Sequence, residues 1–179
     1  WTTLRKIING VTFEIEFVLD EEHAAGRKMF TSAIGDADVV VYDGHAGYGA
    51  NIEGAFTSPG AYPKAKYQIL YLNGCSTYKY GMSEILSSKA LRDGDFNHWN
   101  VDLITTANAA VGHSMNDVLL QKLELAATLY DKPKSQWHNH LNTLSWLGII
   151  TSINKDSDSV PRSDKSEANY AVSGEQGNL

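Results

Sequence analysis

Short apolar runs recur along the chain, and they are typical of strands buried in a sheet. Three of them are compact: residues 38–43 (DVVVYD), 67–72 (YQILYL) and 101–105 (VDLIT). A largely uninterrupted apolar run indicates a strand that is covered on both faces, as in a parallel sheet. Residues 11–19 (VTFEIEFVL) instead begin by alternating apolar and polar side chains, which predicts a strand with one face partly exposed to water.

Apolar residues at helical spacing predict helices between and after these strands. The strongest prediction covers residues 114–130, which are amphipathic and rich in helix-forming side chains, and Pro133 ends this helix. The other predicted helices cover residues 21–34, 82–91 and 136–150.

The order strand, helix, strand, strand, helix, strand, helix predicts an α/β fold. We expect a three-layer sandwich, in which helices flank both faces of a mainly parallel sheet. The chain has 179 residues, of which 42% are hydrophobic, and this is enough for one core. We assign the α/β domain to residues 1–150. Polar and charged residues predominate afterwards, so residues 151–179 are expected to form a flexible or surface segment.

Charge and hydropathy narrow the classes of partner. The net charge of −6 argues against nucleic acid, whose binding depends on clustered Lys and Arg, and favours a peptide or small-molecule partner. No apolar run approaches the roughly 20 residues that cross a bilayer, so we expect no membrane insertion. The single cysteine, Cys75, cannot form an internal disulfide. The compartment stays open, with a lean toward a secreted or periplasmic protein, and a chain that begins at Trp1 is expected to be processed or truncated.

His45 and Cys75 follow two of the predicted strands within two or three residues. In a parallel sheet the carboxyl ends of neighbouring strands meet at one edge, where sites usually form. A cysteine acts as its thiolate, and an imidazole can take the thiol proton and return it to a leaving group. A helix after Cys75 would add backbone N–H groups that favour a thiolate and later an oxyanion. The pattern therefore predicts a Cys/His dyad that acts in hydrolysis.

The two strand ends, VVVYDGHAGYG and YQILYLNGCST, resemble those of the caspase/gingipain/legumain superfamily of cysteine peptidases, also called clan CD. The resemblance implies a caspase-like fold and an endopeptidase that works through an acyl-enzyme, without a metal or organic cofactor. It gives His45 the role of base and acid, Cys75 that of nucleophile, and the amides of Ala46 or Gly47 and Cys75 that of oxyanion hole. It also implies a peptide or protein substrate and a propeptide or additional chain segment. The family usually has Gly after the His and often Ala before the Cys, where this chain has Ala46 and Gly74.

Acidic and aromatic residues near these turns are candidates for the substrate pocket. Asp43 and Asp102 lie near predicted strand ends, which leans toward a basic substrate side chain, and Asp43 is alternatively a group that orients His45. Three tyrosines flank the turns, for which packing at the rim is the ordinary role and substrate contact the alternative. They are Tyr48, Tyr78 and Tyr80.

Other roles for the conspicuous residues stay open at this point. Cys75 alone is compatible with a buried structural thiol. The alternative functions are a non-catalytic caspase-like binding or scaffold domain, which the Ala46 departure favours, and another Cys-dependent acyl transferase. The remaining histidines lack the spacing of a zinc site, so no metal is expected.

Overall fold

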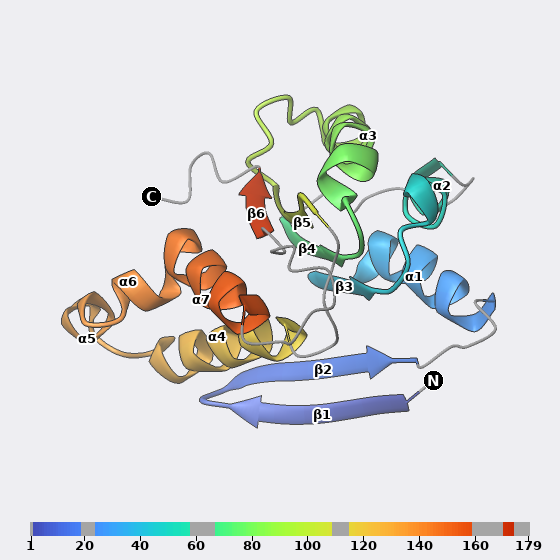
Figure 1. Cartoon of the computed structure of the whole chain (residues 1–179). Helices are drawn as coiled ribbons and strands as arrows, with labels where there is room; N and C mark the ends of the chain where they lie inside the picture. Colours follow the sequence, from blue (N-terminus) through green and yellow to red (C-terminus); the bar gives the residue numbers. More distant parts are fainter. Residues whose placement is uncertain (1, 19–23, 58–66, 109–114, 159–169, 174–179) are drawn as a thin grey trace.

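The computed structural model of the protein describes residues 2–18, 24–57, 67–108, 115–158 and 170–173. Strands and helices alternate through most of the chain (Figure 1). The strands are β1 (Thr2–Ile8), β2 (Val11–Phe17), β3 (Val39–Asp43), β4 (Gln68–Asn73), β5 (Val101–Thr106) and β6 (Tyr170–Ser173). The helices are α1 (Ala24–Asp36), the 3-10 turn η1 (Gly47–Gly49), α2 (Glu53–Thr57), α3 (Thr77–Asp93), α4 (Met115–Leu129), α5 (Lys134–His138), α6 (Leu141–Leu144) and α7 (Trp146–Asp158).

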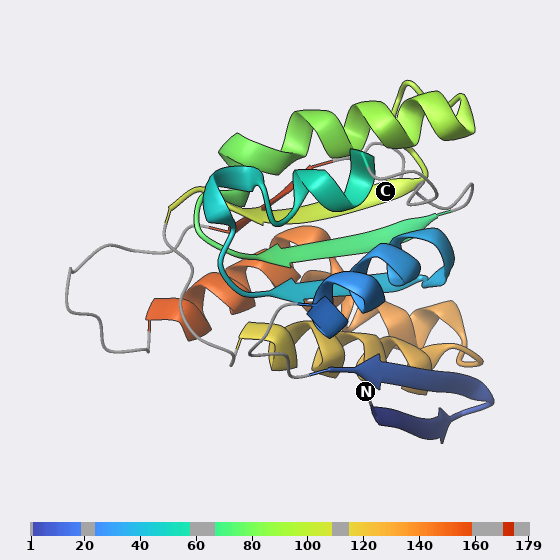
Figure 2. The same cartoon turned by 90° about the vertical axis from the view of Figure 1, so that its right-hand side faces the viewer.

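The main sheet has the strand order β3-β4-β5-β6. β3, β4 and β5 are parallel, and β6 pairs with β5 in the antiparallel direction. Figure 2 shows α3 on one side of this sheet and α4 with α7 on the other. The prediction of an α/β fold with a mainly parallel sheet flanked by helices is confirmed.

Alternating side chains of the three parallel strands build a separate core on each face of the sheet. One core joins the strands to α1, α2 and α3 through residues such as Leu70, Leu72 and Ile85. The other joins them to α4 and α7 through residues such as Tyr71 and Ile153. Because both faces are covered, β4 and β5 are buried at every position, and apolar side chains fill most of β4 and half of β5.

An N-terminal hairpin stands apart from the main sheet. The predicted strand over residues 11–19 is present as β2, but it pairs with β1, which the sequence pattern did not predict. Asn9 and Gly10 connect the two strands with φ angles of 50° and 80°, the left-handed conformation of a type I′ turn. The hairpin rests on α4 (Figure 1), where Lys6 forms an ion pair of 2.8 Å with Glu124.

Two predictions about the C-terminal third are wrong. The helix expected over residues 136–150 is divided into α5, α6 and α7. The backbone leaves the helical region at His140, with φ of −114° and ψ of 0°, and becomes extended at Ser145, with ψ of 153°. The expected flexible or surface segment over residues 151–179 instead begins inside α7 and contains β6, so the domain does not end at residue 150. The physical reason is that Ile153 and Tyr170, within the described part of this segment, are buried in the core.

Some predictions fall partly outside the described residues. The start of the helix expected over residues 21–34 lies there, as does most of residues 159–179. Among the helices that the structure describes, none combines the length and the apolar character needed to cross a membrane.

Candidate active site

The turns after β3 and β4 lie side by side at the carboxyl edge of the main sheet. Asp43, the last residue of β3, pairs with Asn73, the last residue of β4. Beyond this pair the amide of Gly44 still donates a hydrogen bond of 3.1 Å to the carbonyl of Asn73. His45 and Cys75 each follow the paired residues by two positions, so the structure brings together the two segments that carry them.

Gly74 allows these turns to approach closely. A Cβ atom at this position would lie 2.9 Å from the carbonyl oxygen of Gly44 and 3.1 Å from a methyl group of Thr77. Both distances are shorter than ordinary van der Waals contact, and the nearer atom belongs to the backbone, which cannot rotate away. The chain therefore has a physical reason for Gly where the resembling family often has Ala.

The backbone around His45 is fixed by two side chains. Its carbonyl oxygen accepts hydrogen bonds of 2.7 Å from the hydroxyl of Tyr42 and from the amide nitrogen of Asn51. Burial, with a smaller contribution from the charge of Asp43, raises the pKa of Tyr42, although its bond with Asn51 acts in the opposite direction. The phenol is therefore a neutral donor at physiological pH. His45 itself is exposed, while the neighbouring Ala46 is buried in the core.

The turn that carries Cys75 is held from the side of β5. The hydroxyl of Thr77 donates a hydrogen bond of 2.9 Å to the carbonyl of Leu72 and accepts one of 2.9 Å from the amide of Thr106. The hydroxyl of Thr106 donates in turn to the carbonyl of Gly74. Both threonines are fully buried, so these bonds are protected from water. Cys75 is exposed at the end of this framework and precedes α3 by two residues.

Backbone amides gather at the same edge. Ala46 is in the right-handed helical conformation and Gly47 has a φ of 56°, an alternation that points successive N–H groups toward one place. Within the described residues, the amides of Ala46, Gly47 and Cys75 donate no hydrogen bond. The described residues also contain no hydrogen bond between the imidazole of His45 and the sulfur of Cys75, and such bonds commonly tighten only in a complex with substrate.

The two acidic candidates occupy different places. The carboxylate of Asp43 accepts a hydrogen bond of 3.4 Å from the side chain of Asn73. Asn73 is buried and accepts a hydrogen bond of 2.7 Å from the hydroxyl of Tyr170 on β6. A series of hydrogen bonds therefore links β6 to this edge of the sheet. The sequence pattern did not identify Asn73, Thr77, Thr106 or Tyr170. Its only signal was the presence of polar residues at the ends of apolar strands.

Asp102 does not belong to a substrate pocket at this edge, and that prediction is wrong. It is completely buried and is the second residue of β5, at the amino end of the strand, whereas Cys75 follows the carboxyl end of β4. Its carboxylate accepts a hydrogen bond from the hydroxyl of Tyr67. Burial first, and then this carboxylate, raises the pKa of Tyr67 well above its ordinary value.

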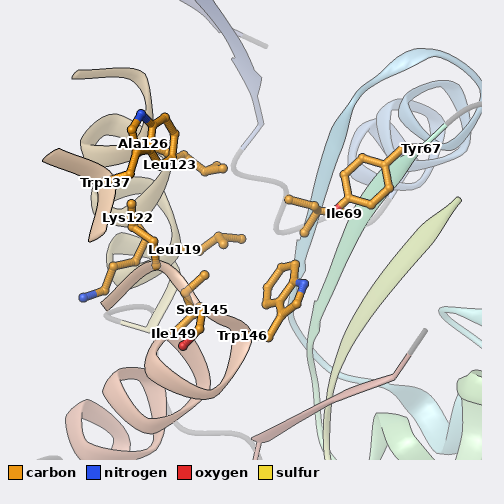
Figure 3. A pocket seen from close by; sticks show the side chains of 11 residues that line it. Tyr67, Ile69, Leu119, Lys122, Leu123, Ala126, Trp137, Ser145, Trp146 and Ile149 are labelled. Carbon is orange, nitrogen blue, oxygen red and sulfur yellow. The ribbon is translucent and has the colours of Figure 1, made fainter. Parts of the chain in front are cut away.

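A cavity of about 270 Å³ lies away from His45 and Cys75, between the amino end of β4 and helices α4 to α7. Figure 3 shows the indole of Trp146 between the sheet and α4, with the ammonium group of Lys122 directed away from the cavity. Since Tyr67 and Ile69 form its wall on the β4 side, the cavity is distant along the strand from Cys75.

The described residues contain no group of three His, Cys, Asp or Glu side chains that could hold a metal ion. Comparisons with protein-family models, curated proteins and solved structures find no match to this chain.

Proposed function

We propose that this chain is a cysteine peptidase with a caspase-like fold, in which Cys75 is the nucleophile and His45 transfers protons. The observation that carries the proposal is the pairing of Asp43 with Asn73, because the turns that bear His45 and Cys75 begin at this pair. Sites in open α/β sheets form beyond the carboxyl ends of the strands, which is where both residues lie. Both are exposed there and can meet a substrate.

The chemistry requires only groups that these turns carry. His45 takes the proton from the thiol of Cys75, and the sulfur attacks the carbonyl carbon of a peptide bond. The C–N bond then breaks as the imidazolium gives its proton to the leaving amine, which leaves a thioester on Cys75. A water molecule, deprotonated by His45, attacks the thioester and releases a carboxylic acid and the thiol.

The amides described above support the stabilisation of an oxyanion. The negative charge that develops on the carbonyl oxygen needs N–H groups that are not already engaged. The amides of Gly47 and Cys75 meet this requirement and belong to exposed residues. Ala46 replaces the glycine that usually follows the histidine in the resembling family, and its methyl group fills the core, so the substitution leaves these amides unobstructed.

The test measures the reactivity of the thiol. Because Cys75 is the only cysteine, the stoichiometry of iodoacetamide labelling reports on this residue alone. We expect parental protein to react well below pH 8, where a free thiol with a pKa of about 8.5 is mostly protonated, and we expect His45→Ala to lose this reactivity. His138→Ala is a matched control, since His138 is exposed on α5 and should leave the labelling unchanged.

Product analysis then defines the reaction. Mass spectrometry of a peptide library incubated with parental protein should show cleaved peptides, and Cys75→Ser should show none. Labelling that is independent of His45, or that begins only on unfolding, would refute the dyad and leave a non-catalytic module. Transfer of acyl groups to added amines without net hydrolysis would instead identify an acyl transferase.

A further inference from the structure

Tyr48 combines an unusual backbone with an unusual exposure. It has a φ of 54°, in the left-handed region that favours Gly or Asn, and lies between Gly47 and Gly49, which also have positive φ angles. Its side chain is 88% exposed, so burial in the core does not explain a tyrosine here. A strained residue that contributes nothing to the core is typical of a functional position.

Among the residues that the structure describes, the ring of Tyr48 makes one aromatic contact, and this contact joins the two halves of the site. It meets the ring of Tyr80 edge to face, with centroids 6.1 Å apart and an interplanar angle of 85°. Tyr48 follows His45 by three residues, and Tyr80 follows Cys75 by five residues in the first turns of α3. The aromatic pair therefore spans the segments that supply the base and the nucleophile.

A positive charge accompanies the pair. The ammonium group of Lys79 lies 5.2 Å from the centroid of the Tyr80 ring, in the geometry of a cation–π contact. This charge repels a second cation placed against the same rings. With Asp102 buried at the opposite end of the strands, Asp43 is the one of these two carboxylates that lies at this edge, and it already accepts a hydrogen bond from the side chain of Asn73.

We infer that Tyr48 and Tyr80 form a platform that binds an aromatic side chain of the peptide substrate next to the cleaved bond. The inference rests on the proposed function, because it requires a peptide held at Cys75. An aromatic substrate ring adds a third member to the edge-to-face pair and covers the exposed face of Tyr48. Arg and Lys are disfavoured at the same place by Lys79.

The experiment uses peptidyl acyloxymethyl ketones, which alkylate an active-site thiol. The compounds differ at one of the two residues before the reactive group, which is Phe, Ala or Arg in turn. The second-order rate constant of Cys75 labelling is measured for each compound by mass spectrometry. We expect Phe at one of these positions to react about three- to tenfold faster than Ala, which corresponds to the usual strength of an aromatic contact. We expect Arg at that position to react more slowly than Ala.

Variants locate the preference. Tyr48→Ala and Tyr80→Ala should bring the Phe-to-Ala ratio close to one. Tyr78→Ala is the matched control. The sequence left substrate contact open for Tyr78, but its ring, 48% exposed on the same helix, lies outside the aromatic pair within the described residues, so this variant should keep the parental ratio. Iodoacetamide, which has no side chain to recognise, is used on every variant to report the dyad itself.

The outcomes separate the platform from the peptidase proposal. His45-dependent iodoacetamide labelling with equal Phe and Ala rates, with a preference for Arg, or with an equal loss in Tyr78→Ala overturns the platform and leaves the dyad intact. Labelling by iodoacetamide that does not depend on His45 overturns the proposed function, and the platform with it.

Discussion

The close approach of the two turns makes Gly74→Ala the most informative single change. The new methyl group would lie 2.9 Å from the carbonyl oxygen of Gly44, and about half an ångström more is needed to reach ordinary contact at 3.4 Å. Neither partner can yield easily. The amide of Gly44 is bound to the carbonyl of Asn73, and the carbonyl of Gly74 is bound to the buried hydroxyl of Thr106.

The expected magnitude follows from this geometry. Forcing a methyl group into a packed site usually costs about 1–3 kcal/mol. Replacing Gly by Ala also restricts the unfolded chain, which returns about 0.4–1 kcal/mol because Gly74 has no left-handed φ. We therefore expect Gly74→Ala to lower the free energy of unfolding by roughly 1–2 kcal/mol. The reacting groups separate as the turns move apart, and we expect kcat/KM to fall about tenfold, since a displacement of 1 Å can cost about 100-fold.

Urea unfolding followed by circular dichroism measures the first effect, and iodoacetamide labelling below pH 8 with peptide hydrolysis measures the second. Gly81→Ala is the matched control. Its new methyl group would meet the ends of the Ile52 and Ile85 side chains at 3.3 and 3.4 Å, and Ala is a better residue than Gly inside α3. The reasoning is refuted if Gly74→Ala is as stable as the parent and its Cys75 reacts at the parental rate.

Further predictions concern the groups around the site. Thr106→Val removes the donor to the carbonyl of Gly74 and should lower the free energy of unfolding by about 1–3 kcal/mol, measured in urea. Tyr170→Phe removes the hydroxyl that donates a hydrogen bond to Asn73. It should lower the free energy of unfolding by about 1 kcal/mol, or Tm by roughly 2–4 °C, as measured by calorimetry. Because folding raises the pKa of Tyr67 above 10, its contribution to stability is complete below pH 10 and is lost as pH rises further, so Tyr67→Phe should flatten the alkaline fall in unfolding free energy between about pH 10 and 12.

The controls for these predictions are the same substitutions at exposed positions. Thr128→Val removes a hydroxyl that donates a hydrogen bond to the carbonyl of Leu125 at an exposed position of α4, and should change stability by less than about 0.5 kcal/mol. Tyr130→Phe, at a residue 72% exposed, serves both tyrosine variants and should leave Tm and the alkaline slope as in the parent. Equal effects of control and test variants would contradict the roles assigned to the buried hydroxyl groups.

The parallel strands of the sheet were predictable from the sequence because each one is marked by a run of neighbouring apolar residues. Residues 69–72 are apolar without interruption, and such a short run is typical of a strand covered on both faces. The positions of His45 and Cys75 after neighbouring strands then followed from the common direction of those strands. Their exposure and the contact of the two turns needed the three-dimensional structure, since both depend on the register of Asp43 against Asn73.

The missed strands had weaker or non-local signals. β1 carries Arg5 and Lys6 at its centre and is exposed at almost every position, so no apolar pattern marks it, although the Asn9-Gly10 turn was a usable sign of a hairpin. β6 has four residues, and pairing with a strand more than sixty residues earlier leaves no trace in the local sequence. Asp102 was misplaced although the predicted strand over residues 101–105 already put it at the amino end, because its nearness to a strand end was considered without asking which end it was.

The hydrogen bond between Tyr170 and Asn73 joins residues that are 97 positions apart. During synthesis, a nascent chain that has already made β3, β4 and β5 still lacks the hydroxyl group that β6 brings to the edge beside Asp43. The order of translation therefore delays completion of this edge until residues 170–173 have left the ribosome and joined the sheet.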